Sequence, residues 1–323
     1  MIPKKLQIGD QIRVVAPSRS LSIMEEENRS RAIDVLESFG FNVTFGKHVM
    51  ESDMMTSSSI ASRIEDLHDA FRDPDVQAIL TVIGGYNCNQ LLPYLDYDLI
   101  RQNPKILCGY SDITALSNAI YAKTGLITYS GPHFSTFAMK KGLDYTLEFF
   151  QKCLTSTEPI TITPADFWSD DPWYREQEQR TFYPNQGWHI LQEGKAEGTI
   201  IGGNLCTLNL LQGTPFMPSL RDSILFLEDD SLVFPEIWDR DLQSLLQQPD
   251  FNEVRGIVIG RFQKESQMTR EKLAYIIQTK LELCGIPIVA DLDFGHTTPI
   301  FTFPIGGQVK LHAENRKIYL EII

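Results

Sequence analysis

Apolar runs alternate with amphipathic stretches through the first half of the chain. Short apolar runs, each typical of a buried strand, lie at residues 12–16, 41–45, 76–83, 105–108 and 127–130. Between them, the apolar positions recur at helical spacing over residues 24–39, 57–71 and 112–123. Strands that alternate with helices favour a parallel sheet with helices on both faces. We therefore expect an α/β fold that begins with a doubly wound, flavodoxin-like N-terminal domain over residues 1–155.

The second half repeats this alternation from residue 193 and has more strand near its end. Strand candidates lie at residues 198–204, 223–227, 256–260, 287–290, 308–312 and 317–322, and helical patterns at 205–211, 235–246 and 269–284. We expect a C-terminal α/β domain with additional β-structure over residues 193–323. Two domains also agree with a length of 323 residues, because roughly 100–200 residues per domain is usual.

The connection between the two halves, residues 156–192, has a different composition. It contains few aliphatic residues but many aromatic ones: Phe167, Trp168, Trp173, Tyr174, Phe182, Tyr183 and Trp188. A connection this long without periodicity is usually functional or disordered, and its aromatic content argues against disorder. Two interpretations remain open, a linker whose tryptophans dock on a domain and a substrate-facing loop that offers flat stacking surfaces.

Composition and charge exclude several classes of protein. The net charge is -13 and no Lys/Arg run exceeds a pair, so a nucleic acid polymer is not an expected partner. No uninterrupted apolar run is long enough to span a membrane, and the N-terminus lacks the apolar run of a signal peptide. Five well-separated cysteines without a CxxC pair favour free thiols in the cytoplasm. No histidine or cysteine spacing typical of a metal site occurs, so we expect no metal.

Ser111 lies between the predicted strand 105–108 and the predicted helix 112–123. A serine on such a turn faces the crevice at the carboxyl end of the sheet, and the first helical N–H groups point at whatever it attacks. The residue two positions after Ser111 is Ile113 where the G-x-S-x-G signature requires glycine, so the α/β-hydrolase fold is not predicted. A serine nucleophile also needs a base, which this turn does not contain.

His296 and Glu228 are the candidates for that base and for its carboxylate partner. His296 lies in a loop bounded by Gly295 and Pro299, a setting suited to proton transfer, although a surface histidine is the simpler interpretation. Glu228 follows the predicted strand 223–227 and precedes two more acids, so a solvated acidic turn explains it equally well. The order Ser, Glu, His along the chain matches that of Ser…Asp/Glu…His hydrolases.

Two glycine-rich turns accompany these residues. Gly84-Gly85 ends the predicted strand 76–83, and Gly202-Gly203 ends the predicted strand 198–204. Gly84-Gly85 could donate a backbone N–H to an oxyanion or could simply form a tight turn. The same two interpretations apply to Gly202-Gly203. Neither matches G-x-G-x-x-G or the P-loop pattern, so nucleotide phosphate binding of those kinds is not indicated.

Taken together, these motifs resemble the LD-carboxypeptidase family of serine peptidases over essentially the whole chain. The matching segments are Gly84-Gly85-Tyr86, Gly109-Tyr110-Ser111-Asp112, Gly202-Gly203-Asn204, Leu227-Glu228-Asp229 and Gly295-His296. The resemblance implies a triad divided between two domains, with Ser111 as nucleophile, His296 as general base and Glu228 as its orienting carboxylate. It also implies an oxyanion hole formed by the backbone N–H groups of Gly85 and Asp112, each worth about 3–4 kcal/mol.

The family has two branches with different substrates. One removes the terminal D-alanine from murein tetrapeptides, and the other, the microcin C immunity peptidases, cuts the amide between an acidic amino acid and a modified nucleotide. The aromatic connection resembles the second branch, which stacks a tryptophan on the nucleobase. The resemblance thus implies a small peptide or peptidyl-nucleotide substrate, no cofactor, a cytoplasmic homodimer, and substrate contacts from Tyr86, Asn204, Trp168 and Trp173. A non-catalytic protein whose two lobes close on a small ligand is the alternative from another class.

Overall fold

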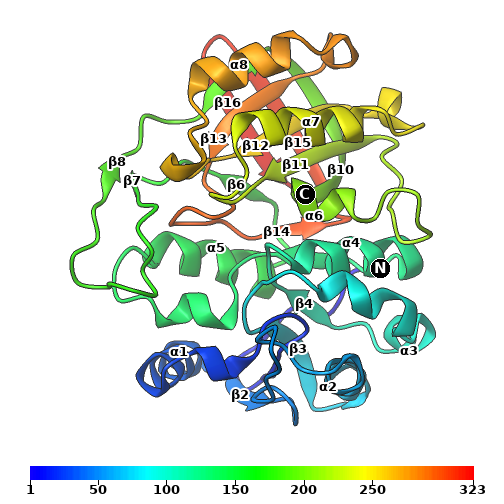
Figure 1. Cartoon of the computed structure of the whole chain (residues 1–323), viewed down its shortest axis with the longest axis vertical. Coiled ribbons are helices and arrows are strands. Elements are labelled where there is room, and N and C mark those ends of the chain that lie inside the picture. The colour runs from blue at the N-terminus through cyan, green and yellow to red at the C-terminus, as the bar shows by residue number, and fades with distance from the viewer.

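The computed structural model describes all residues from 1 to 323 and consists of two β-sheets stacked along the long axis of the molecule (Figure 1). The first sheet has the strand order β14-β5-β4-β3-β1-β2. Its strands are β1 (Gln11–Val15), β2 (Asn42–Phe45), β3 (Val76–Thr81), β4 (Ile106–Cys108), β5 (Thr128–Ser130) and β14 (Phe303–Ile305). Strands β1 to β5 are parallel in the order 2-1-3-4-5, which confirms the flavodoxin-like prediction.

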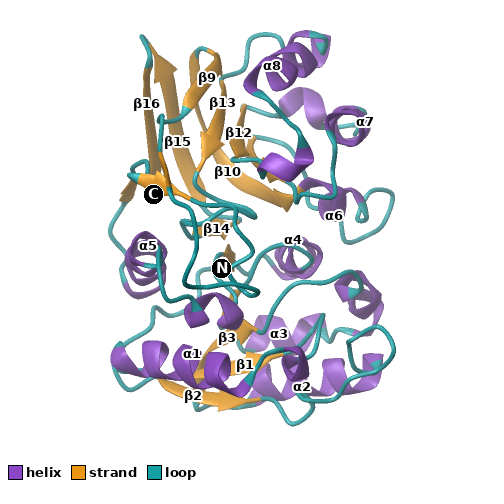
Figure 2. Cartoon of the chain, turned by 60° about the vertical axis from the view of Figure 1, so that its left-hand side comes forward, coloured by secondary structure: helices purple, strands orange, loops and turns teal.

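The helices of the first half pack around this sheet. They are α1 (Glu26–Ser38), α2 (Ile60–Arg72), α3 (Tyr97–Gln102), α4 (Ile113–Thr124) and α5 (Asp144–Thr155). Helices α4 and α5 lie between the two sheets (Figure 2). Because eight of the twelve residues of α4, from Ile113 to Ile120, are buried, this helix belongs to the core of both halves.

The second sheet has the strand order β6-β16-β15-β10-β11-β12-β13-β9. Its strands are β6 (Ile160–Ile162), β9 (His189–Gln192), β10 (Gly194–Asn204), β11 (Ser223–Glu228), β12 (Gly256–Gly260), β13 (Ile288–Leu292), β15 (Gln308–Glu314) and β16 (Lys317–Ile322). The four central strands β10 to β13 are parallel, and the outer strands pair antiparallel. Three helices lie beside this sheet (Figure 2): α6 (Leu205–Asn209), α7 (Pro235–Leu246) and α8 (Arg270–Gln278).

Shorter elements complete the fold. Strands β7 (Phe167–Trp168) and β8 (Tyr183–Pro184) form a two-stranded sheet within the aromatic connection. Short 3-10 helices lie at Leu21–Ile23, Cys88–Tyr94, Phe134–Ala138, Phe251–Glu253, Lys264–Ser266 and Leu281–Leu283. No helix combines the length and the apolar character that crossing a bilayer requires.

The predicted helix over residues 269–284 is wrong at its C-terminal end. Helix α8 stops at Gln278, and Lys280 is already extended, with φ -99° and ψ 107°. The ammonium group of Lys280 pairs with Asp239 of α7 at 2.5 Å, and its side chain is only 10% exposed. This contact with the neighbouring helix is a tertiary interaction that the periodicity of the sequence does not contain.

The chain crosses between the two sheets more than once. Strand β14, from the second half of the sequence, pairs with β5 at the edge of the first sheet. Strands β6 and β9, from the connection 156–192, pair with β16 and β13 in the second sheet. The two halves are therefore joined by strand pairing as well as by packing.

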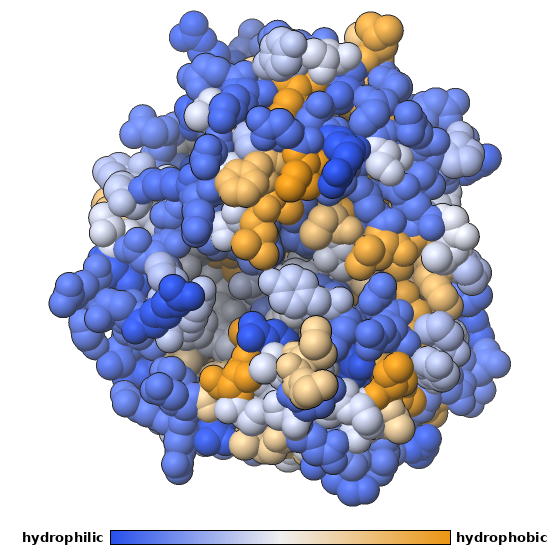
Figure 3. All heavy atoms as spheres, viewed as in Figure 1, coloured by the Kyte–Doolittle hydropathy of each residue, from blue (hydrophilic) through white to orange (hydrophobic).

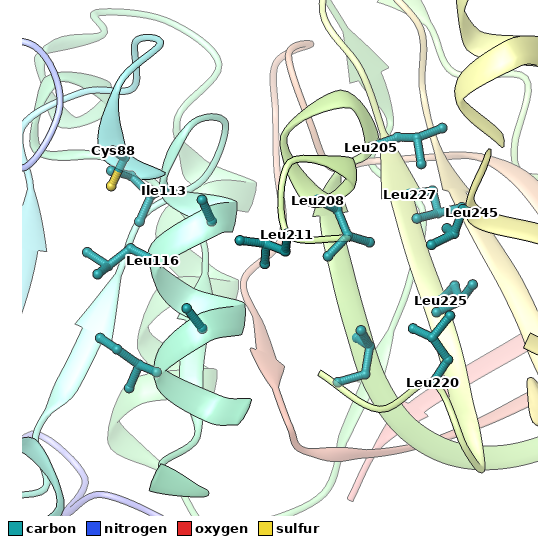
Figure 4. Packing of buried hydrophobic residues seen from close by; sticks show 14 of the residues in the cluster. Cys88, Ile113, Leu116, Leu205, Leu208, Leu211, Leu220, Leu225, Leu227 and Leu245 are labelled. Atoms are coloured by element: carbon teal, nitrogen blue, oxygen red, sulfur yellow. The ribbon is translucent and has the colours of Figure 1, made fainter. Parts of the chain in front are cut away.

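A continuous hydrophobic core fixes the way the two halves dock. One cluster of 41 buried side chains runs from the first sheet through α4 and α6 into the second sheet. Figure 4 shows Leu208 and Leu211 on the side of α4 that faces the second sheet, and Ile113 and Leu116 on the opposite side of this helix, near Cys88. Because both sheets share this cluster, the geometry at their junction is determined by close packing.

One buried polar contact strengthens the same junction. The side chain of Asn118 on α4 donates to the carbonyl of Gly202 at 2.8 Å and accepts from the Gly202 N–H at 3.3 Å. Asn118 is fully buried, so removing its side chain would take one hydrogen bond from each of two backbone groups of Gly202 in the interior.

We predict that Asn118→Ala lowers the free energy of unfolding by about 2–4 kcal/mol, because two buried backbone groups lose their hydrogen bonds and a cavity opens. Urea denaturation measures this loss. The matched control is Ala122→Ser, at an exposed position of the same helix, which should change stability by less than about 0.5 kcal/mol. Equal stability of the Asn118 variant and the wild type would show that this contact does not hold the halves together.

Candidate active site

The turn that carries Ser111 connects β4 to α4 in a strained conformation. Ser111 has φ +60°, a left-handed value that is rare for residues other than glycine and is typical of functional turns. The turn fits because Gly109 has no side chain, since a Cβ there would overlap the hydroxyl of Thr81. Ile113, where an α/β-hydrolase has glycine, is fully buried in the shared core. This turn therefore exposes its serine while anchoring the next residues in the interior.

Three residues that are far apart in the sequence meet at this turn. The hydroxyl of Ser111 lies 3.1 Å from Nε2 of His296, and Nδ1 of His296 lies 2.7 Å from Oε2 of Glu228. Glu228 is the last residue of β11, and His296 lies in the loop after β13. In the neutral form of His296, the carboxylate accepts from Nδ1–H and Nε2 is left to accept the proton of the serine hydroxyl. The surface of the molecule is hollowed between its two halves (Figure 3).

Glycine residues allow the chain to pack closely around Glu228. A Cβ at Gly295 would lie 2.6 Å from Oε2 of Glu228, and Gly295 also has φ +99°. Glu228 is 2% exposed and Asp229 is completely buried. The solvated acidic turn considered from the sequence is therefore wrong for these two residues.

The charges around His296 oppose the effect of its burial. Burial lowers the pKa of the imidazole, but the facing carboxylate of Glu228 and the nearby Asp230 and Asp229 outweigh burial and raise this pKa to about 9. The paired carboxylate thus stabilises the imidazolium form. With a pKa near 9, His296 is largely an imidazolium at neutral pH, and the neutral form that can take the proton of a nucleophile becomes populated as the pH approaches 9.

A second buried carboxylate, Asp229, holds Asn204 in place. Asp229 accepts from Nδ2 of Asn204 at 3.0 Å and from the backbone N–H of Cys206 at 3.2 Å. Burial, followed by the charge of Glu228, raises the pKa of Asp229 to about 7. Asn204 is 2% exposed, and its side-chain oxygen caps α6 through the N–H of Thr207. The structure therefore places Asn204 next to the site with most of its hydrogen-bonding groups already occupied.

The glycine turn after β3 lies directly against Ser111. A Cβ at Gly84 would be 2.9 Å from Oγ of Ser111. The N–H groups of Gly85 and Asp112 donate no hydrogen bond within the protein, and both are next to the nucleophile turn. Tyr86 is 72% exposed at the same turn. Two unpaired N–H groups beside a serine hydroxyl are what an oxyanion hole requires.

The aromatic connection is docked beside the loop of His296. Ser169 and Thr298 exchange two backbone hydrogen bonds of 2.7 Å each, and Ser169 is completely buried. Further along, the indole N–H of Trp188 donates to Asp293 at 3.0 Å. The connection is therefore docked on the protein close to His296, and its role as a substrate-facing surface stays a prediction.

The two tryptophans expected to meet substrate have different surroundings. The ring of Trp168 has the guanidinium of Arg261 at 4.9 Å and the ammonium of Lys264 at 5.2 Å from its centre. Trp173 is half-buried against the second hydrophobic cluster, and its neighbour Tyr174 is 65% exposed. Trp168 is therefore already engaged by two cations, whereas no cation lies over the ring of Trp173.

The sequence interpretation missed Tyr110 and His133. The ring of Tyr110 lies between His133, 4.3 Å away between ring centres, and His296, 5.3 Å away. Burial, followed by the charge of His296, lowers the pKa of His133 to about 3, so this imidazole is neutral, and its Nδ1 is hydrogen-bonded to the hydroxyl of Thr81 at 2.8 Å. His133 follows β5 at the carboxyl edge of the sheet, and that placement is a signal that could have found it.

The structure also records the state of the cysteines and of possible metal ligands. All five cysteines are free thiols. No group of three or more His, Cys, Asp or Glu side chains is arranged to hold a metal ion.

Comparison with known proteins identifies the class of this chain. Residues 12–131 match the LD-carboxypeptidase N-terminal domain and residues 197–311 match the LD-carboxypeptidase C-terminal domain. YocD of Bacillus subtilis, which carries the name of a carboxypeptidase, is 57% identical over 97% of this chain and 96% of its own. The protein is thus an enzyme, a carboxypeptidase of the serine type. It belongs to the LD-carboxypeptidase family, as the sequence motifs predicted.

Relatives with more specific names fall into both branches of the family. The microcin C7 self-immunity protein MccF of Escherichia coli is 34% identical over 98% of this chain and 95% of its own. A probable murein peptide carboxypeptidase of Bacillus subtilis is 32% identical over 99% of this chain and 94% of its own.

Solved structures of MccF-like proteins have the same fold. An MccF-like protein from Bacillus anthracis has a TM-score of 0.99 and 58% identity, with 100% of this chain and 99% of that chain covered. MccF in complex with glutamyl sulfamoyl guanosine has a TM-score of 0.89 and 33% identity, with 99% and 97% covered. These similarities confirm the predicted fold class.

We predict that NMR titration of His296 gives a pKa above the ordinary value of about 6.5, near 9, because the facing carboxylate stabilises the imidazolium. In Glu228→Gln the charge is lost while burial remains, so this pKa should fall toward 6.5 or below.

Asp230→Asn is the matched control, because Asp230 raises the same pKa less than Glu228 does. Its titration should move in the same direction by a smaller amount. A pKa of His296 that is unchanged in Glu228→Gln would contradict the electrostatic coupling of the pair.

Proposed function

We propose that this enzyme is an amidase of the microcin C immunity type, which hydrolyses the amide between an acidic amino acid and a modified nucleotide. The observation that carries the proposal is the aromatic connection, which is hydrogen-bonded through Ser169 to Thr298, two residues from His296. An aromatic surface so close to the reacting groups suits a substrate with a flat base near its scissile bond. The similarity to MccF over nearly the whole chain supports the same substrate class.

In the proposed mechanism, Ser111, His296 and Glu228 form a catalytic triad. His296 takes the proton of the Ser111 hydroxyl through Nε2 as Oγ attacks the carbonyl carbon, and Glu228 stabilises the imidazolium through Nδ1–H. The N–H groups of Gly85 and Asp112 bind the oxyanion of the tetrahedral intermediate. His296 then gives the proton to the leaving nitrogen, and the amide bond breaks to leave an acyl-enzyme. Water, activated by His296, hydrolyses this ester, releases the acid and restores the serine.

We also propose where the substrate lies. Tyr86, exposed at the oxyanion turn, and Asn204, beside Glu228, are the contacts for the amino-acid part. Trp168 and Trp173 are the contacts for the nucleoside part. The cations over Trp168 compete with base stacking there, which favours Trp173 as the stacking surface.

The second candidate function is that of a murein tetrapeptide LD-carboxypeptidase that removes the terminal D-alanine. The similarity to the murein peptide carboxypeptidase of Bacillus subtilis favours it. The same triad would carry out this reaction, so the two functions differ in the part of the substrate that the aromatic connection contacts. The division into domains at residues 155 and 193, the cytoplasmic location and the homodimer remain predictions based on sequence and family resemblance.

We predict that the wild type releases glutamate from glutamyl sulfamoyl guanosine at least tenfold faster, in kcat/KM, than it releases D-alanine from an LD-tetrapeptide. Ser111→Ala should lower the first rate by about 10⁴-fold or more, because no other group replaces the nucleophile. Chromatography of the released products measures both reactions.

The matched control is Ser117→Ala, which removes a buried hydroxyl from α4, the helix that follows Ser111. This variant should keep most of the activity. Undiminished turnover by Ser111→Ala would overturn the mechanism. Faster turnover of the tetrapeptide would instead assign the murein function.

A further inference from the structure

The side chain of Asp112 has an unusual place for a residue at the start of a helix. Asp112 precedes α4, yet its carboxylate does not cap that helix. One oxygen, Oδ2, instead accepts from the hydroxyl of Ser18 at 2.5 Å and from the backbone N–H groups of Asn87 at 3.0 Å and Cys88 at 2.9 Å. The side chain is nearly inaccessible, since Asp112 is 2% exposed. Three donors on one buried oxygen make a strong, directional attachment.

These hydrogen bonds join the two turns that flank the nucleophile. Asn87 and Cys88 belong to the loop after β3 that begins with Gly84 and Gly85, and Asp112 belongs to the turn after β4. The backbone of the two turns exchanges no hydrogen bond. The carboxylate is therefore the direct hydrogen-bonded link between them.

A buried cation supports the same loop from its other side. Nη1 of Arg63 donates to the carbonyls of Pro17 and Asn87 and to the side-chain oxygen of Asn87, and Nη2 donates to Gln90. Arg63 is 3% exposed. Burial raises the pKa of Asp112, and its hydrogen bonds to Ser18, Cys88 and Asn87, followed by the charge of Arg63, oppose this rise only in part. The ends of β1, β3 and β4 are thus tied together by two buried side chains of opposite charge.

We propose that the carboxylate of Asp112 is a positioning residue that fixes the distance between the two N–H groups of the oxyanion hole. One of these N–H groups belongs to Asp112 itself. The other belongs to Gly85, which lies two residues before Asn87, whose N–H donates to the Asp112 carboxylate. A donor must lie about 2.7–3.1 Å from the oxyanion to be effective, so a small separation of the two turns weakens stabilisation of the transition state. This inference rests on the function proposed above.

A positioning role and a purely structural role predict different kinetics. The oxyanion forms in the transition state, so loosening its donors lowers kcat and leaves KM nearly unchanged. A carboxylate that only stabilised the loop would change the stability of the protein and leave kcat of the folded enzyme intact.

We predict that Asp112→Ala lowers kcat for glutamyl sulfamoyl guanosine about 100-fold, with KM changed by less than about threefold. Asp112→Asn keeps one oxygen as an acceptor and should recover part of this loss. Ser18→Ala removes one of the three donors and should cause a smaller fall in kcat of the same kind. If Asp112→Ala does not fold, Ser18→Ala tests the positioning role in its place.

The control variant is Asp96→Ala, which removes a carboxylate that caps α3 away from the nucleophile turn. It should lower stability and leave kcat as in the wild type. A rise in KM with unchanged kcat in the Asp112 variants, or a loss of kcat in Asp96→Ala of the same size, would overturn the positioning role.

A second readout does not depend on the substrate. Amide hydrogen exchange at Asn87 and Cys88 should be slow in the wild type and at least tenfold faster in Asp112→Asn. Equal exchange in the two proteins would overturn the inference even if the wild type is an active amidase. Accelerated exchange in Asp112→Asn would support the link between the two turns even if the wild type does not hydrolyse the nucleoside substrate. That combination would contradict only the proposed function.

Discussion

The contact between α4 and β10 is the constraint on which the rest of the site depends. Ser111 begins the turn that leads into α4, and Glu228 ends the strand that lies next to β10. The hydroxyl of Thr114 accepts from the N–H of Asn204 at 3.0 Å, and a Cβ at Gly203 would lie 2.5 Å from that hydroxyl. Together with Asn118, which binds the backbone of Gly202, these contacts hold the serine of one sheet against the carboxylate of the other. No flexible segment is needed to bring the two together.

Three buried carboxyl groups lie around the serine, and each has hydrogen-bonding partners. Glu228 and Asp229 are adjacent and buried, and each has a distinct partner, His296 for the first and Asn204 for the second. On the other side of the serine, Asp112 accepts hydrogen bonds from Ser18, Asn87 and Cys88, which follow strands β1 and β3 of the first sheet. A buried carboxylate without partners would lower stability by several kcal/mol. Glu228, Asp229 and Asp112 therefore each hold a neighbouring segment in place through their hydrogen bonds.

Much of this arrangement could be predicted from the sequence, because it follows from local rules. Apolar runs located the five parallel strands of the first sheet, and their alternation with helices predicted the parallel, doubly wound arrangement. The position of Ser111 after β4 and of Glu228 at the end of β11 followed from the tendency of functional groups to gather at the carboxyl ends of strands. The distances between these residues, however, depend on how the two sheets dock, which no local pattern contains.

Other features could not be predicted for the same reason. Strand β14 joins the first sheet from late in the chain, and α8 ends where Lys280 binds a neighbouring helix. His133 carries no motif, and its place after β5 was the only signal for it. The motif at the serine includes Asp112 for its backbone N–H, but the contacts of the Asp112 carboxylate are tertiary. The aromatic connection was recognised by its composition, but its attachment to the loop of His296 is a tertiary contact.

The most direct test of the central claim is a double-mutant cycle on Ser111 and His296. Turnover of glutamyl sulfamoyl guanosine is measured for Ser111→Ala, for His296→Ala and for the double variant, with folding checked by circular dichroism. If the two residues act as one unit across the junction of the sheets, each single variant falls to a similar residual rate and the double variant is no slower. Losses that multiply in the double variant would mean that the two residues act independently, and would contradict a triad assembled across that junction.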